Sequence, residues 1–312
     1  MNNNQELHLV LGGAGAIGSE VIAELRRRNV PTKAVERQKR VAGVETIHAD
    51  LLDLEEFSTA AKGATHLYLC VGLPYSGKIW ERDWPRLMKN TIEVCKIHKV
   101  KLIFFDNVYM YGPSLSVPCT EDHTQSPQSK KGKVRKEIAD LLIKAFKAGT
   151  IQGLIGRSAD FYGPNAVNTV LYVSFIENIL KNKRPIWLGK PGIKHTYAYT
   201  KDNARALVAL ALEETCYGQV WHLPTGDPLT IEELMRLVNQ HAHTSYTVQY
   251  VPRMMLYISG LFVPIIKEVT EMLYQFDYPY VISFEKFKEK FPDFKVTPYD
   301  QGIQETLESF KK

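Results

Sequence analysis

Residues 7–18, LHLVLGGAGAIG, decide the fold of this 312-residue chain. A short apolar run comes first, with the length and composition of a buried parallel strand. Three glycines at a spacing of three follow, Gly12, Gly15 and Gly18, and a helical pattern of apolar residues begins at once at Ile17. Glycines at such positions let the backbone turn tightly, approach a ligand closely and pack the new helix against the strand.

The start of that helix predicts a dinucleotide site. Its first N–H groups have no intrahelical partners, and the positive end of the helix dipole faces the same way, which suits a pyrophosphate. A glycine triplet alone is a weak signal. This one lies between a strand and a helix at the start of a βαβ pattern, so we interpret it as a binding loop rather than a structural turn. The predicted cradle consists of Gly12, Gly15, Ala16, Ile17 and Gly18.

The remaining pattern alternates short apolar runs with helical periodicity. Strands are expected at 32–35, 44–50, 65–71, 101–105, 150–156 and 219–223, and helices at 85–99, 130–147, 169–181 and 201–213. This order predicts an α/β protein with a doubly wound (Rossmann), mostly parallel sheet and a smaller C-terminal substrate lobe. We expect the Rossmann domain to comprise 1–164 plus 194–222, and the lobe 165–193 plus 223–312.

Composition narrows the function classes. The chain is 45% hydrophobic and 23% charged, as in ordinary globular proteins, and its net charge of +5 is too diffuse to predict nucleic-acid binding. Four scattered cysteines, without a CxxC pair or histidines at metal spacing, predict reduced thiols, no metal and a cytoplasmic protein. The polar first residues predict no signal peptide, and the lack of an 18-residue apolar stretch predicts no membrane span.

The end of the second strand bears on the cofactor. An acid there usually holds the adenosine ribose hydroxyls, whereas a base accommodates a 2′-phosphate. Glu36 and Arg37 offer both. Together with Lys39 and Arg40, Arg37 favours NADP over NAD, although these two further bases also suit a solvated loop.

Two apolar segments have alternative interpretations. The aromatic stretch 73–84, with Tyr75, Trp80 and Trp84, either lines a substrate pocket at the carboxyl end of the sheet or packs in the core. Residues 254–266 are apolar but contain Pro264 and no basic face. We therefore expect lobe packing or a homodimer interface there rather than a membrane-surface segment.

Several motifs follow one another in an order found in one family. They are the glycine triplet, Ala49-Asp50-Leu51, the VYMYGP segment 108–113, Arg157 with YGP at 162–164, and His195-Thr196-Tyr197 with Asp202. In this the chain resembles the NAD-dependent epimerase/dehydratase proteins, which are extended short-chain dehydrogenases/reductases. Many of them act on nucleotide sugars.

The resemblance implies further cofactor contacts. Asp50, with Leu51 beside it, would meet the adenine amino group, and Gly72 would let the backbone pass close to the cofactor. Alternatively, Asp50 or Asp53 caps the helix that begins near Leu54, and the two roles can coexist on different residues.

The resemblance breaks at the catalytic residues. The family carries a Ser or Thr after the fifth strand and a helical Tyr-x-x-x-Lys, whose lysine lowers the pKa of the phenol. Lys133 matches the lysine, but Ser129 stands at the tyrosine position and Asn107 at that of the serine. No tyrosine occurs between Gly112 and Phe161, so no shift of register restores the motif.

Two hypotheses explain this loss. In the first, catalysis has moved: Tyr109 donates the proton with a pKa lowered by a nearby cation, the Asn107 amide polarises a carbonyl, and Lys133 bonds the nicotinamide ribose. In the second, the chain is a silent NAD(P)-binding redox sensor, similar to the NmrA-like proteins. We favour the first, an NAD(P)-dependent oxidoreductase or epimerase acting on a hydroxyl or carbonyl of a small molecule such as a nucleotide sugar. The aromatic loops and the substrate lobe support it.

The other polar candidates have structural alternatives. Arg157 and Asp160 contact substrate or form an ion pair, His195 is expected to be a packed, hydrogen-bonded histidine, and Arg205 is expected at the surface. The basic residues between 130 and 136 are expected to form a solvated helix face, with Lys133 turned inward.

Overall fold

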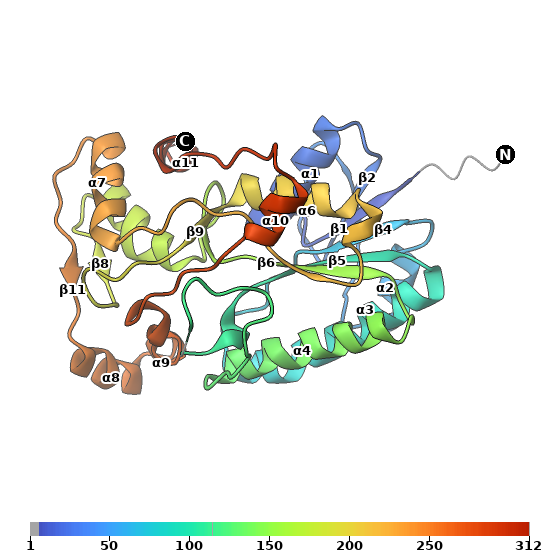
Figure 1. Ribbon diagram of the computed structural model, residues 1–312, viewed down its shortest axis with the longest axis horizontal. Coiled ribbons are helices and arrows are strands. Elements are labelled where there is room, and N and C mark those ends of the chain that lie inside the picture. Colours follow the sequence, from blue (N-terminus) through green and yellow to red (C-terminus); the bar gives the residue numbers. More distant parts are fainter. Residues whose placement is uncertain (1–5, 114, 312) are drawn as a thin grey trace.

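The computed structural model describes residues 6–113 and 115–311, and its centre is a seven-stranded parallel sheet (Figure 1). The strand order is β10-β6-β5-β4-β1-β2-β3. The chain adds β2 and β3 on one side of β1 and then crosses over to add β4 and the later strands on the other side, as in a doubly wound fold. The strands are β1 (His8–Leu11), β2 (Thr32–Glu36), β3 (Glu45–His48), β4 (His66–Leu69), β5 (Lys101–Asp106), β6 (Gly153–Arg157) and β10 (Val220–His222). The predicted fold class is confirmed.

Helices cover both faces of the sheet (Figure 1). On one face lie α1 (Ala16–Arg27) and α6 (Thr200–Ala211), and on the other α2 (Leu54–Ala60), α3 (Gly77–His98) and α4 (Lys130–Lys147). Successive strand residues point to opposite faces. Ile103 of β5 therefore packs under α1 and α6, whereas its neighbours Leu102 and Phe104 pack under α3 and α4.

Helix α3 begins earlier than expected and changes the interpretation of the aromatic stretch. Pro85, which we expected at the helix start, lies inside α3. Trp80 and Trp84 are consequently helical and are buried in the core below α3. For these two side chains the core-packing alternative is correct.

The helix expected at 169–181 also differs from the prediction. It consists of a π-helical turn (Tyr172–Ile176) followed by the short α5 (Glu177–Leu180).

A second group of elements has its own apolar core, at the left of Figure 1. It contains two small parallel sheets, β7 (Asp160–Tyr162) with β9 (Tyr197–Tyr199) and β8 (Ile186–Trp187) with β11 (Gln249–Tyr250). Its later helices are α7 (Ile231–Ala242), α8 (Arg253–Phe262), α9 (Pro264–Thr270) and α11 (Tyr299–Ser309). The start of α7 carries a complete capping box between Thr230 and Glu233.

Helix α10 (Glu285–Lys290) departs from the expected division. Phe287 is fully buried in the core that the sheet shares with α1 and α6, and the Lys286 Nζ donates to the carbonyl oxygen of Val220 in β10 at 2.7 Å. Part of the 223–312 segment therefore packs with the Rossmann sheet. The proposed domain boundaries otherwise stay a prediction.

Three further observations concern the cysteines, metal ligands and apolar helices. All four cysteines are free, and among the described residues no group of His, Cys, Asp or Glu could hold a metal ion. Within residues 6–113 and 115–311, no helix is both long and apolar enough to cross a membrane.

Candidate active site

The glycine loop between β1 and α1 leaves room for a ligand. Gly12 has φ +78°, which favours glycine, and a Cβ on Gly18 would lie 2.1 Å from the Gly12 carbonyl oxygen. Gly15 precedes α1 without a side-chain cap, and the first turn carries no acid. The loop is therefore closed tightly by glycines, while the first N–H groups of α1 remain available to an anion.

Glu36 lies at the carboxyl end of β2 beside this loop. Its Oε1 accepts a hydrogen bond from the Ala14 N–H at 2.6 Å, and the side chain is half-buried. Arg37, the next residue, is exposed. The carboxylate thus stands where the ribose of an adenosine would meet the loop.

In the turn after β3, Asp50 and Asp53 make different contacts, which bear on the two roles that the sequence left open, helix cap and adenine contact. Asp53 caps α2, because its Oδ1 accepts from the N–H groups of Glu55 at 2.9 Å and Glu56 at 3.0 Å. Asp50 instead accepts from the Leu52 N–H at 3.0 Å through Oδ1 only. In the described part of the chain its second oxygen has no hydrogen-bond partner, which leaves it available for an adenine amino group.

Gly72, just beyond β4, faces open space. It is exposed, and a Cβ at this position would meet no atom within 4 Å. Together with the tight loop at Gly12, the half-buried Glu36 and the uncapped start of α1, this opening fits a dinucleotide lying across the carboxyl ends of β1 and β4.

A buried ionic network lies at the end of β5. Asp106 accepts from Arg135 Nε at 2.7 Å and lies 3.5 Å from Arg157 Nε, and all three side chains are buried. Arg157 also donates to the Tyr111 hydroxyl at 2.9 Å. For Arg157 the ion-pair alternative is correct, and Tyr111 is occupied by the same network. Arg205, which was expected at the surface, is half-exposed and pairs with the buried Asp202 in the first turn of α6.

Asn107 and Ser129 are the residues that the sequence resemblance aligns with a catalytic serine and tyrosine. The Asn107 Oδ1 accepts from the Tyr109 N–H at 3.1 Å. Its amide nitrogen, which makes no bond within the described residues, can therefore donate to a substrate. Ser129 is buried and caps α4, since its Oγ accepts from the Gly132 N–H at 3.0 Å. The serine thus has a structural task that tyrosine cannot perform.

The inward face of α4 differs from the expected one. Lys131 and Arg135 are buried, whereas Lys133 is exposed, so the expectation that Lys133 turns inward is wrong. Lys131 and Arg135 are four residues apart and therefore share one face of the helix, on which Lys133 does not lie. The Lys131 Nζ forms ion pairs with Glu268 and Glu271 and lies 4.4 Å from the centre of the Tyr75 ring.

Tyr109 lies in a group of phenols rather than beside a cation. Its hydroxyl is hydrogen-bonded to that of Tyr75, and burial raises the pKa of Tyr109 well above its usual value. The expected lowering of this pKa is therefore wrong: burial disfavours the phenolate, and the nearby Tyr75 and Asp160 disfavour it further.

Tyr274, from the 3-10 turn η4 (Leu273–Phe276), completes this group. Its hydroxyl bonds the Ser129 side chain and lies 3.4 Å from the Tyr109 carbonyl oxygen. Sequence reasoning missed Tyr274, because nothing local connects it to a residue 165 positions earlier. Tyr75, Tyr109 and Tyr274 are hereafter the phenol group.

Asp160 and His195 adjoin the phenol group. The Asp160 Oδ2 lies 3.0 Å from His195 Nε2, and His195 is buried and hydrogen-bonded as expected. Besides burial, the Asp160 charge contributes to raising the pKa values of Tyr75 and Tyr274. These phenols are thus held in the protonated form at neutral pH.

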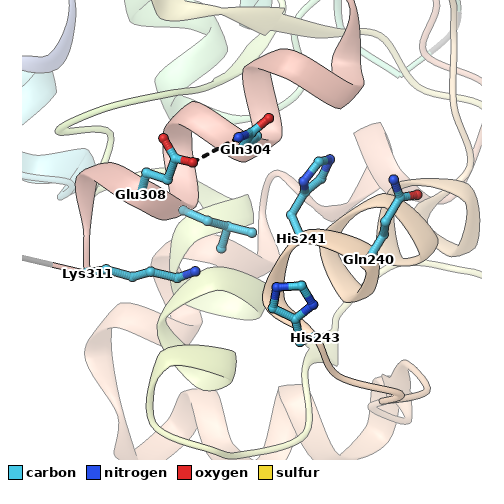
Figure 2. Close-up of a pocket in the computed structure, with 7 residues that line it drawn as sticks. Gln240, His241, His243, Gln304, Glu308 and Lys311 are labelled. Atoms are coloured by element: carbon cyan, nitrogen blue, oxygen red, sulfur yellow. Dashed lines mark hydrogen bonds between the residues drawn. The ribbon is translucent and has the colours of Figure 1, made fainter.

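A surface hollow between α7 and α11 lies apart from these residues (Figure 2). Its polar lining consists of Gln240, His241, His243, Gln304, Glu308 and Lys311. None of them belongs to the predicted site, and Gln304 already donates to Glu308 at 2.9 Å.

Comparisons with known proteins agree with this geometry. A curated UDP-N-acetyl-alpha-D-glucosaminuronate decarboxylase of Bacillus cytotoxicus is 22% identical over 97% of each chain. The structure of Thermus thermophilus UDP-glucose 4-epimerase in complex with NAD superposes with a TM-score of 0.78 at 23% identity, covering 98% of this chain and 99% of that one. Thermotoga maritima UDP-glucose 4-epimerase with UDP-glucose gives 0.81 at 20% identity, covering 98% of both chains. At these identities the likeness shows the fold. The model of the NAD dependent epimerase/dehydratase family matches residues 8–220, more than half of the chain, and this protein belongs to that family.

Proposed function

We propose that the chain binds NAD between the glycine loop and Gly72 and uses it to convert a nucleotide sugar. The observation that carries the proposal is the cradle itself. Glu36 is fixed on the Ala14 N–H beside an uncapped helix start, and the backbone at Gly72 is open. Family membership supports the cofactor class, and the decarboxylase and the two epimerases named above support the substrate class.

Of the two nicotinamide dinucleotides, the geometry favours NAD. The Glu36 carboxylate can accept hydrogen bonds from both ribose hydroxyls, whereas it would repel a 2′-phosphate. The preference for NADP that the sequence predicted depends on three basic residues, Arg37, Lys39 and Arg40, all of which are exposed. Arg37 is then the residue that would have to hold a phosphate.

Bound NAD would accept a hydride from a substrate carbon and return it. For the chain's own residues, we propose that the Asn107 amide orients the reacting oxygen and that Lys133 bonds the nicotinamide ribose. Ser129 holds the start of α4 and thereby the position of Lys133. Tyr109 keeps its proton at neutral pH and is the proposed donor in the direction in which a hydride returns to a substrate carbonyl, with Tyr274 and Tyr75 bonded around it. In the opposite direction its phenolate would have to accept the proton of the substrate hydroxyl, which the raised pKa disfavours.

Calorimetry and a turnover screen test the proposal. Titration with NAD and with NADP gives the cofactor, and Glu36→Ala should weaken NAD binding while Arg37→Ala leaves it unchanged. Incubation with NAD and UDP-sugars, followed by chromatography of the products, tests the reaction. Tyr109→Phe should abolish turnover with NAD affinity intact, whereas Tyr278→Phe, at an exposed tyrosine, is the control.

Each outcome is informative. Failure of both dinucleotides to bind refutes the proposal. Tight NAD binding without turnover of any nucleotide sugar replaces it by the redox-sensor hypothesis. Full activity in Tyr109→Phe but not in Tyr274→Phe would move the proton donor to the C-terminal lobe.

We further propose a cytoplasmic location and a homodimer. The four free cysteines suit a reducing compartment. The apolar side chains exposed on α8 and α9, among them Leu261 and Phe262, support the dimer.

A further inference from the structure

Asp160 and His195 form a pair at the edge of the sheet where the cofactor is proposed to lie. Asp160 is the first residue of β7 and follows the carboxyl end of β6, and ligands of doubly wound proteins bind outside such ends. His195 comes two residues before β9, which pairs in register with β7. The Asp160 Oδ2 lies 3.0 Å from the His195 Nε2, so two short paired strands bring these side chains together.

The His195 side chain is held in place and holds Asp160 in turn. Its backbone exchanges two hydrogen bonds with Leu229, both at 3.0 Å, and its ring lies against those of Phe276 and Tyr280. An ionised carboxylate only accepts, so the His195 Nε2 carries a proton and donates it to Asp160. The buried Nδ1 has no hydrogen-bond partner within the described residues, so Asp160 is the one polar contact of the ring there.

Asp160 keeps one oxygen free for a ligand. Its Oδ2 is occupied by His195, whereas its Oδ1 has no hydrogen-bond partner in residues 6–113 and 115–311. The side chain of Asp160 is 20% exposed and that of His195 is 4% exposed. A substrate at this edge of the sheet can therefore reach the carboxylate but not the imidazole.

Apart from His195, the titratable groups that face Asp160 are phenols that keep their protons at neutral pH. Glu271 also acts on two of these phenols, but it pairs with the buried Lys131. Among the described residues, Asp160 is thus the carboxylate beside the phenol group that no lysine or arginine neutralises. Besides burial, the charge of Asp160 helps to raise the pKa of each of these phenols, which are Tyr75, Tyr109, Tyr197, Tyr274 and Tyr280.

Oxidation of a substrate alcohol needs a proton acceptor at this place. A hydride leaves the carbon only as the hydroxyl proton leaves the oxygen, so a group with a free lone pair must take that proton. The protonated phenols and the Asn107 amide nitrogen are donors, and the Ser129 hydroxyl is bound to the start of α4. The free oxygen of Asp160 is the acceptor that remains.

We propose that Asp160 is the catalytic base of the proposed reaction and that His195 positions it. In the oxidising direction the substrate O–H bond breaks and its proton passes to the Asp160 Oδ1. The substrate C–H bond gives its hydride to NAD, and the carbon–oxygen bond becomes a carbonyl. When the hydride returns, Tyr109 protonates the oxygen, and the proton held by Asp160 restores Tyr109. This inference rests on the proposed function, because it assigns a step of the same reaction.

Stopped-flow absorbance of NAD reduction tests the step, with the UDP-sugar that wild type converts. Asp160→Asn should slow reduction at least about 100-fold, with NAD affinity and melting temperature unchanged. Asp300→Asn is the matched control, since it removes a carboxylate that lies 2.8 Å from the Nε2 of His241, outside the site. The slow variant Asp160→Ala should regain rate in formate, which supplies the missing carboxylate.

Further measurements separate catalysis from structure. The reduction rate of wild type should fall in acid as Asp160 becomes protonated, and Asp160→Asn should lack that fall. His195→Leu should lower the rate, and His195→Gln, which keeps an N–H donor for Asp160, should restore most of it. Nitrogen NMR of the protein without ligands should show His195 protonated on Nε2, and Asp160→Asn should shift that signal.

Several results would overturn the inference. Full reduction rates in Asp160→Asn would refute it, and so would a slow Asp160→Ala that formate does not accelerate, since the carboxylate would then have a structural task. A loss of rate in acid that persists in Asp160→Asn would place the base elsewhere, and a His195 protonated only on Nδ1 would remove the pair. In each of these cases turnover by wild type leaves the proposed function standing. A wild type that binds no NAD or converts no UDP-sugar refutes that function, and this inference with it.

Discussion

His222 makes the free energy of unfolding depend on pH by an amount that can be calculated. Its Nδ1 lies 2.8 Å from the Ser283 carbonyl oxygen, which only accepts, so Nδ1 carries the proton and Nε2 accepts from the Tyr111 hydroxyl. Burial lowers the pKa of His222 from 6.5 to about 3. The folded chain therefore keeps this side chain neutral at a pH where the unfolded chain protonates it.

The sign and the size follow from proton linkage. Between pH 6.5 and pH 3 the unfolded chain binds one more proton at His222 than the folded chain does, so the free energy of unfolding falls as the pH is lowered. Each unit costs about 1.4 kcal/mol, and lowering the pH from 7 to 5 removes about 2 kcal/mol through this residue. Glutamine at 222 retains a donor and an acceptor but cannot be protonated, so His222→Gln escapes this loss.

Urea unfolding at pH 7 and pH 5, followed by tryptophan fluorescence, measures the effect. The drop in unfolding free energy should be about 2 kcal/mol larger for wild type than for His222→Gln. Other groups, including the buried His8, titrate in both proteins and cancel in the comparison. His48→Gln, at an exposed histidine, should lose as much as wild type. Equal losses in wild type and His222→Gln would refute the assignment of a neutral, buried His222.

Three further substitutions separate binding from stability. Gly72→Ala should leave the melting temperature unchanged and lower NAD affinity about tenfold by calorimetry, whereas Gly77→Ala changes neither; unchanged affinity would move the cofactor away from Gly72. Asp106→Asn leaves two buried guanidinium groups without their counter-charge and should cost about 3–5 kcal/mol in urea unfolding. Asp140→Asn, at an exposed pair, should cost under about 1 kcal/mol, and equal costs would contradict the buried network. Thr230→Ala removes a helix cap and should cost about 1 kcal/mol in the same assay; no loss would make the capping box irrelevant.

Most of the sheet could be predicted because its signal is local. The runs at 7–11 and 101–105 are apolar apart from His8 and Lys101, as is typical of strands covered on both faces, and β1 and β5 form there. The start of α3 was missed for an equally local reason. Pro85 is typical of a helix's first turn, yet here the packing of Trp80 and Trp84 against the sheet extends the helix through it.

The candidate site was predictable only where one segment supplies it. The glycine loop and Glu36 belong to one βαβ unit, and the Glu36 carboxylate accepts from the Ala14 N–H; its role towards the ribose stays a prediction. The inward lysine of α4 depends instead on which elements pack against the helix, so Lys131 and not Lys133 is buried. Tyr274 reaches Ser129 through the tertiary fold, which no local pattern encodes.

Helix α10 has a consequence for anyone who divides this protein. The aromatic side chains of Phe287, Phe291 and Phe294 pack together in the core that covers the sheet beside β10, and the Phe294 ring lies under Arg205 of α6. A fragment ending at residue 222 would leave that space to water and expose a large part of its own interior. Residues 1–222 expressed alone should therefore aggregate, and a soluble fragment would have to retain residues 284–294, joined by a linker.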